Sequence, residues 1–172
     1  FEDDGTLHGD NFDGIGFVAG LKDYGNLLKD KKILIVGAGG ASRALAVELI
    51  SEPIKSLNII NRSFEKAKKV VQTVKSVRQT DKINAVEKEH IDYAEYDFVI
   101  NATSLGMKSD DPLPFPIISL RPDCVVCDII MKPEETKLLS AAKRSGIKVH
   151  YGKHMLDYQI SFIADFIGAF KT

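Results

Sequence analysis

The sequence predicts an α/β fold with a doubly wound parallel sheet of about six strands and helices on both faces. Short apolar runs alternate with amphipathic stretches along the chain, as expected for parallel strands joined by helical crossovers. One apolar run passes directly into a glycine-rich turn that opens a helix. The chain has 172 residues, 44% of them hydrophobic, which suits one domain of ordinary size.

Six apolar runs are expected to form the strands. The first, residues 32–36, is stopped by glycines and has the composition of a fully buried parallel strand. The others are expected at residues 57–60, 83–86, 98–100, 124–130 and 148–151. Their alternation with helices places all six in one sheet.

Helices are expected before, between and after these strands. Ser63 is a candidate N-cap for the helix after the second strand, and Glu65 suits its first turn. Pro133 opens a helix that stops at Gly146, after cations in its last turn. The remaining helices are expected at residues 14–28, 41–50 and 155–170.

Charge and cysteine content narrow the functional classes. Lys and Arg number 23 and Asp and Glu 24, so the net charge is −1, and neither nucleic acid nor an anionic membrane surface is an expected partner. The apolar runs are too short to span a bilayer. Cys124 and Cys127 are expected on opposite faces of a strand, which predicts no metal site. Two cysteines make no disulfide scaffold, so a reducing cytoplasm is expected.

The glycine-rich turn after the first strand predicts a dinucleotide site of the Rossmann type. The first glycine would make the tight turn, and the second would let the backbone approach a pyrophosphate at a helix N-terminus. Ser42 stands at the third glycine position of the usual pattern, and an ordinary strand-to-helix turn is the alternative. The predicted phosphate-binding residues are Gly37, Ala38, Gly39, Gly40 and Ala41.

The end of the second strand predicts which dinucleotide binds. An NAD site usually places a carboxylate there, for the ribose 2′-hydroxyl. Here the segment Asn61-Arg62-Ser63 is followed by Lys66, and these cations favour the 2′-phosphate of NADP. A solvated basic helix start is the alternative interpretation.

Five segments together resemble the shikimate dehydrogenase family, in the family's order. Residues 9–14 are similar to its G-x-N-T-D-G segment, and residues 37–41 to its phosphate loop. The others are 61–66, like its N-R-T-x-x-R clamp for NADP, 101–107, like its N-A-T-S-x-G-M turn, and 152–159, like its G-x-G-M-L-x-x-Q segment. The resemblance implies a Rossmann-like domain and transfer of hydride between NADP and 3-dehydroshikimate or shikimate, a step of chorismate and aromatic amino acid biosynthesis.

The resemblance also implies roles for individual residues. Asp13 matches a catalytic Asp that shares proton transfer with a lysine; from its spacing alone, Asp13 would be an N-cap. Gln159 and Met131 match substrate-contacting positions, although Met131 replaces a tyrosine of the family. The matched cofactor-contacting positions are Thr103, Ser104, Ile129 and Gly152. A hydrogen-bonded turn, a strand core and a strand end are their respective alternatives.

The resemblance further implies an incomplete enzyme. Because the chain begins at Phe1, it is expected to be a piece of a longer polypeptide. Residues 1–30 would be a hinge and a helix from the substrate-domain side, 31–152 the NADP-binding domain, and 153–172 a helix returning to the substrate domain. The fragment alone is expected to be inactive, and the longer protein to be a homodimer acting on a small cyclic hydroxy acid.

Two departures leave the function open to alternatives. Phe12 stands where the family usually has Thr, and Met131 and its neighbours replace the tyrosine-containing stretch. Both departures lie on the substrate side. Quinate or another shikimate-like polyol is therefore an alternative substrate, and a non-catalytic nucleotide- or metabolite-sensing module is the alternative from another functional class.

Overall fold

The computed structural model describes residues 5–6 and 9–169. Its centre is one six-stranded sheet in the order β3-β2-β1-β4-β5-β6, with every neighbouring pair parallel. This order is that of a doubly wound nucleotide-binding sheet, as predicted. The strands are β1 (Lys32–Val36), β2 (Ser56–Ile60), β3 (Ile83–Ala85), β4 (Phe98–Asn101), β5 (Val125–Asp128) and β6 (Lys148–His150).

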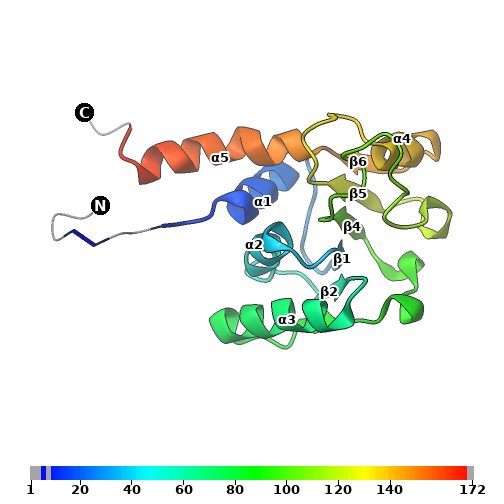
Figure 1. Cartoon of the computed structure of the whole chain (residues 1–172), viewed down its shortest axis with the longest axis horizontal. Coiled ribbons are helices and arrows are strands. Elements are labelled where there is room, and N and C mark those ends of the chain that lie inside the picture. Colours follow the sequence, from blue (N-terminus) through cyan, green and yellow to red (C-terminus); the bar gives the residue numbers. More distant parts are fainter. Residues whose placement is uncertain (1–4, 7–8, 170–172) are drawn as a thin grey trace.

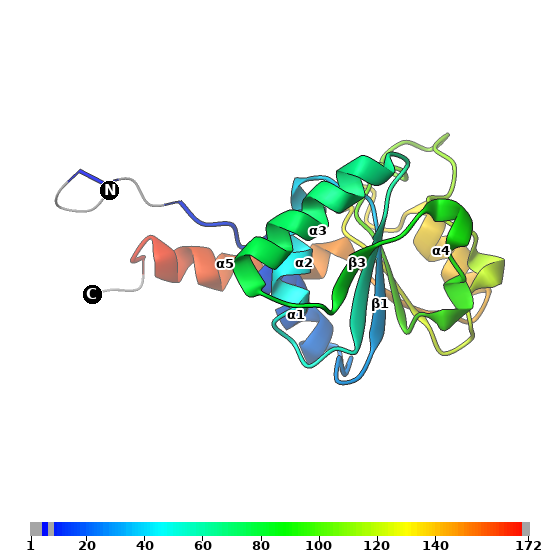
Figure 2. The same cartoon turned by 90° about the horizontal axis from the view of Figure 1, so that it is seen from below.

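Helices cover both faces of the sheet, so the predicted three-layer arrangement is confirmed (Figures 1 and 2). One face packs against α1 (Asp13–Asp23), α2 (Gly40–Leu49), α3 (Phe64–Arg78) and α5 (Gly152–Phe166). The other face packs against α4 (Lys137–Arg144) and the short 3-10 helices η2 (Tyr93–Glu95) and η3 (Ile117–Ser119). A further 3-10 helix, η1 (Lys88–His90), has no buried residue. In the part of the chain that the structure describes, no helix is long and apolar enough to cross a membrane.

Helix α1 approaches two other helices through its glycines. A Cβ atom on Gly14 would collide with the backbone carbonyl of Ala44 in α2. A Cβ atom on Gly16 would lie 2.5 Å from the carbonyl oxygen of Met155 in α5. Figure 1 shows α1 and α5 side by side as a consequence. The expected helix at 14–28 is shorter at its C-terminal end, because α1 stops at Asp23 and Gly25 follows with φ +73°.

Two helix starts differ from the sequence-based expectation. Helix α4 begins at Lys137 and not at Pro133, because Thr136 has an extended backbone and its Oγ1 accepts a hydrogen bond from the Leu139 amide at 3.3 Å. Ser63 occupies the N-cap position of α3, but its side chain makes no capping hydrogen bond. Helix α5 begins at Gly152, three residues before the expected start.

The two cysteines lie in separate layers of the core, which confirms the prediction of opposite faces. Cys124 is fully buried among the side chains around α4, and Cys127 among those around α1 and α2. Burial raises the pKa of the Cys124 thiol to about 12 and that of Cys127 well above its usual value. Both thiols are therefore protonated and unreactive in the folded protein.

A cluster of aromatic rings joins β6 to the start of α5 and the end of α1. His150 is 1% exposed, and its ring centroid lies 5.0 Å from that of His154. The ring of His154 in turn lies 3.8 Å from that of Tyr24. Burial lowers the pKa of His150 from 6.5 to about 4, so the folded protein holds this ring neutral at neutral pH.

This histidine is expected to make stability pH-dependent. As the pH falls below 6.5, the unfolded chain takes up a proton at position 150 before the folded protein does, so stability is lost down to about pH 4. The loss is about 3 kcal/mol, from the size of the shift. Urea unfolding of the wild type and of His150→Phe at about pH 7 and about pH 4 measures it. The difference between the two proteins should change by that amount, and a constant difference would contradict the prediction.

Candidate functional site

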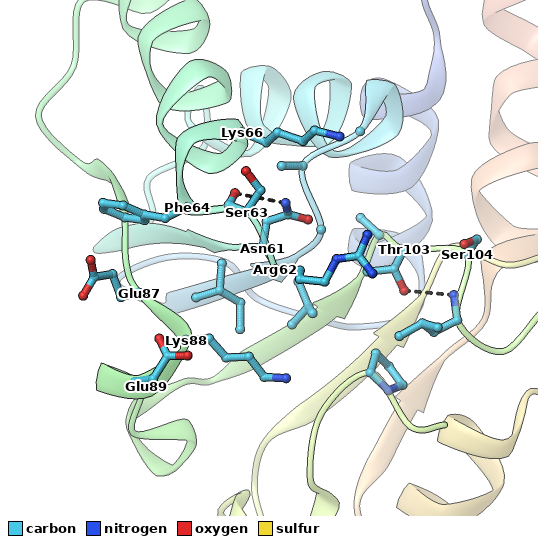
Figure 3. Close-up of a pocket in the computed structure, with 18 residues that line it drawn as sticks. Asn61, Arg62, Ser63, Phe64, Lys66, Glu87, Lys88, Glu89, Thr103 and Ser104 are labelled. Atoms are coloured by element: carbon cyan, nitrogen blue, oxygen red, sulfur yellow. Dashed lines mark hydrogen bonds between the residues drawn. The ribbon is translucent and has the colours of Figure 1, made fainter. Parts of the chain in front are cut away.

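A cavity of about 830 Å³ lies at the carboxyl edge of the sheet, where the strand order reverses between β1 and β4 (Figure 3). Doubly wound sheets bind their ligands at this point. Loops following β1, β2, β3 and β4 form its walls. The lining residues are Val36–Gly39, Ile60–Phe64, Lys66, Glu87–Glu89, Ala102–Leu105 and Pro114.

The glycine turn forms the floor of the cavity. Gly37 has φ +118°, and a Cβ atom there would lie 2.6 Å from the carbonyl oxygen of Ala102. A Cβ atom on Gly39 would meet nothing within 4 Å, so that backbone is open to a ligand. Gly40 and Ala41 begin α2 and lie outside the lining of this cavity. The first three predicted loop residues therefore line the cavity, and the last two begin α2.

Ser42 explains how the turn departs from the usual third glycine. Its side chain is fully buried, and its Oγ donates a 2.8 Å hydrogen bond to the Gly37 carbonyl. The hydroxyl thereby ties the start of α2 back to the turn. A small polar side chain fits where the pattern usually has no side chain, so the departure does not disrupt the site.

Cations converge on the cavity from two loops. Arg62 and Lys66 follow β2, and neither forms an ion pair with another described residue. Lys88 enters from η1 and was missed in the sequence, because a 3-10 turn has no periodic signal. In Figure 3 the side chain of Arg62 extends toward Thr103, and those of Lys66 and Lys88 point away from Phe64.

The remaining β2-loop residues shape the cavity wall. The Asn61 Nδ2 atom donates to the Ser63 carbonyl at 3.1 Å. The amide of Lys66 donates to the same carbonyl, also at 3.1 Å. These bonds fold the segment after β2 into a turn that holds Arg62 at the cavity.

The turn after β4 is held by one buried side chain. Asn101 Oδ1 accepts hydrogen bonds from the Thr103 amide at 3.1 Å and from its Oγ1 at 2.7 Å. Asn101 Nδ2 donates to the Leu105 carbonyl at 3.0 Å, and the Leu105 amide donates to Thr103 Oγ1 at 3.0 Å. Thr103 and Ser104, which are predicted cofactor contacts, line the cavity, while Asn101 was not singled out in the sequence.

Asp13 and Gln159 form a pair outside this cavity. Gln159 is 7% exposed, and its Nε2 donates to Asp13 Oδ1 at 2.5 Å. The spacing-based expectation that Asp13 caps α1 is wrong, because Phe12 is the N-cap residue and Asp13 is the first helical residue. The Asp13 amide instead donates to Asn11 Oδ1 at 3.0 Å. The carboxylate is therefore free of a capping role and faces α5.

The other three predicted positions gather beyond β5. A Cβ atom on Gly152 would lie 2.6 Å from the Ile129 carbonyl carbon and 2.5 Å from the Ile130 oxygen. Gly152 therefore packs directly on the segment that carries Ile129. Met131 follows and is 42% exposed. None of Ile129, Met131 and Gly152 lines the cavity. Among the described residues, no group of three or more His, Cys, Asp or Glu side chains is arranged to hold a metal ion.

Comparisons with known proteins agree with this architecture. The family model described as "Shikimate / quinate 5-dehydrogenase" matches residues 21–107. The chain is 40% identical to a shikimate dehydrogenase (NADP(+)) of Geobacillus kaustophilus over 158 residues, 91% of this chain and 56% of that protein. It thus spans little more than half the length of the curated relatives it matches.

Two solved structures share the fold at substantial identity. A shikimate dehydrogenase in complex with NADP+ is 36% identical with a TM-score of 0.83, covering 91% of this chain and 55% of that one. The Listeria monocytogenes shikimate 5-dehydrogenase, in complex with shikimate and NAD, is 33% identical with a TM-score of 0.80, covering 91% and 57%. The family model, the sequence relatives and the shared Rossmann-like sheet agree, and the chain belongs to the shikimate / quinate 5-dehydrogenase family.

Proposed function

We propose that this chain is the nucleotide-binding part of an NADP-dependent shikimate dehydrogenase, which reversibly reduces 3-dehydroshikimate to shikimate. The main support is that two cations, Arg62 and Lys66, line the cavity beside the glycine turn. Neither has an ion-pair partner among the described residues. A 2′-phosphate brings two negative charges to this end of the site. The names of the relatives support the same nucleotide and substrate.

The cavity and the segments beyond it at the carboxyl edge of the sheet would share the dinucleotide. The open backbone at Gly37–Gly39 would take the pyrophosphate, with Gly40 and Ala41 adding amides at the start of α2. Asn61 and Ser63 would shape the ribose pocket around Arg62 and Lys66. On the other half of the sheet, the proposed contacts are Thr103, Ser104, Ile129 and Gly152. Bound NADP supplies or accepts the hydride.

The pair of Asp13 and Gln159 would handle the substrate. As the substrate carbonyl oxygen gains negative charge, a neighbouring proton donor or cation stabilises it. Asp13 would share this role with a lysine from the part of the longer relatives that this chain does not span. Gln159 would hydrogen-bond a substrate hydroxyl, and Met131 would border the same substrate.

The domain boundaries remain part of the proposal. Residues 1–30 and 153–172 would connect residues 31–152 to the substrate-binding part, which is consistent with the packing of α1 against α5. The chain alone would then bind NADP without turnover. The longer protein would be a cytoplasmic homodimer acting on a small molecule.

The Arg62→Ala substitution tests the proposed cofactor. Its guanidinium would donate charged hydrogen bonds to the 2′-phosphate, so the loss of NADP affinity is expected to be roughly 1.5–3 kcal/mol, or about 10- to 150-fold. NAD lacks this phosphate and should bind almost unchanged. Isothermal titration calorimetry of the chain with each nucleotide measures both.

A matched control removes the same charge elsewhere. Arg78 lies at the exposed end of α3 and does not line the nucleotide cavity, so Arg78→Ala should leave both affinities unchanged. Equal losses of NADP and NAD affinity in Arg62→Ala would contradict the assignment of Arg62 to the 2′-phosphate. A wild-type chain that binds NADP no more tightly than NAD would contradict the proposed function itself.

A further inference from the structure

Asp128 is a buried carboxylate behind the nucleotide site to which neither the sequence patterns nor the proposed function gives a role. It ends β5 and is 0% exposed. Its Oδ1 accepts hydrogen bonds from Asn101 Nδ2 and from the Ile130 amide, both at 3.1 Å. Its Oδ2 accepts from Thr136 Oγ1 at 2.7 Å. Burial raises the pKa of this carboxyl group to about 6.

These hydrogen bonds join two segments that belong to the same half of the site. Through Asn101, the carboxylate reaches the turn at Thr103–Leu105, which lines the cavity. Through the Ile130 amide, it reaches the segment that packs against Gly152. Gly106 allows close packing at this junction, since a Cβ atom there would lie 3.3 Å from Ile130 Cδ1.

The two halves of the sheet have different tasks in a dinucleotide site. The half containing β1, β2 and β3 takes one mononucleotide, and the half containing β4, β5 and β6 takes the other. Arg62 and Lys66 belong to the first half, which would hold the phosphorylated adenosine. Asp128 and its partners belong to the second half, which would hold the nicotinamide ribose and ring.

We propose that Asp128 is a positioning residue for the nicotinamide half of the site, acting through Asn101 on the Thr103–Leu105 turn and through Ile130 on the segment against Gly152. This inference rests on the proposed NADP function. A buried carboxylate that accepts three hydrogen bonds fixes its donors more tightly than a neutral acceptor would. None of the described residues in the β1–β3 half of the sheet donates a hydrogen bond to this carboxylate.

The test compares a whole nucleotide with its adenosine half. The Asp128→Ala substitution in this chain should weaken NADPH binding roughly tenfold or more, the scale of a lost charged hydrogen bond. It should leave the affinity for 2′,5′-ADP within about twofold, because that ligand lacks the nicotinamide and is held at the other half. The fluorescence of bound NADPH should also change, since it reports the surroundings of the nicotinamide ring.

Two control variants separate positioning from stability. Asp128→Asn keeps an oxygen that can accept from Asn101 and Ile130 but loses the charge, so it should restore part of the NADPH affinity and of the fluorescence signal. Thr136→Val removes the hydroxyl that caps α4 but leaves the Asn101 contact in place. It should lower the urea midpoint without changing the ratio of the two affinities.

The outcomes distinguish this inference from the proposed function. Suppose that the wild type binds both NADPH and 2′,5′-ADP. If Asp128→Ala then lowers both affinities equally, or lowers neither, the positioning role is overturned and the NADP site stands. An Asp128→Asn variant as impaired as Asp128→Ala would overturn it as well. If wild type binds neither ligand, both proposals fall. Should Asp128→Ala lack a cooperative unfolding transition, Asp128→Ser is judged by the same ratio.

Discussion

The Gly37→Ala substitution is expected to lower the free energy of unfolding by roughly 2–6 kcal/mol and to remove nucleotide binding. Two costs add. A non-glycine residue at φ +118° carries backbone strain of roughly 1–3 kcal/mol. Its Cβ atom would also lie 2.6 Å from the carbonyl oxygen of Ala102, and such overpacking costs typically about 1–3 kcal/mol. Both segments are held by backbone hydrogen bonds, since the Gly37 amide donates to the Ile60 carbonyl and the Ala102 amide to the Val36 carbonyl, each at 2.8 Å.

A second glycine of the same turn supplies the control. Gly39 has φ −94°, and a Cβ atom there would meet nothing within 4 Å. Gly39→Ala should therefore unfold in urea nearly as wild type does, while weakening NADP by obstructing the approach of its pyrophosphate. Equal stability of the Gly37→Ala and Gly39→Ala proteins would contradict the account of the turn given above.

The Gly16→Ala substitution is expected to destabilise the contact between α1 and α5. Its Cβ atom would lie 2.5 Å from the Met155 carbonyl oxygen and 2.7 Å from Gln159 Cγ. The helices must move apart, at a cost of about 1–3 kcal/mol. Because the added Cβ atom would displace the Gln159 side chain, the hydrogen bond from Gln159 to Asp13 should be lost as well. Urea unfolding measures the first effect, and the NMR signal of the Gln159 side-chain amide the second.

The intrinsic effect of alanine in a helix has the opposite sign. In an open helical position, Gly to Ala stabilises by up to about 1 kcal/mol. Gly40 is such a position, since it begins α2 and a Cβ atom there meets nothing within 4 Å. Gly40→Ala should be as stable as wild type or more so. If Gly16→Ala behaved in the same way, close approach of the helices would not explain that glycine.

Local patterns were sufficient to predict the sheet and most of the nucleotide loop. The run Lys32–Val36 is apolar because both sheet faces are covered, and a glycine must follow where φ becomes positive. The same local reasoning placed Arg62 after β2 and Thr103 after β4, the two strands that flank β1. Strand ends of a parallel sheet meet at one edge, so these predictions needed no knowledge of side-chain contacts.

Features that depend on tertiary contacts were out of reach of such patterns. Asp13 has the spacing of an N-cap, yet its carboxylate turns to Gln159, 146 residues away in the chain. Pro133 has the appearance of a helix start, but Thr136 is drawn into a hydrogen bond with Asp128 and starts α4 later. Lys88 and Asn101 act through turns and buried amides, which leave no periodic signal in the sequence.

The separation of Cys124 and Cys127 between the two layers gives the molecule one chemical reporter for each side of its sheet. A thiol reagent can reach either sulfur only after the surrounding layer has opened, because both are fully buried and protonated. The relative rates of labelling of the two thiols therefore compare how often each layer opens transiently. The change in each labelling rate on adding a nucleotide shows which of the two layers the nucleotide stabilises.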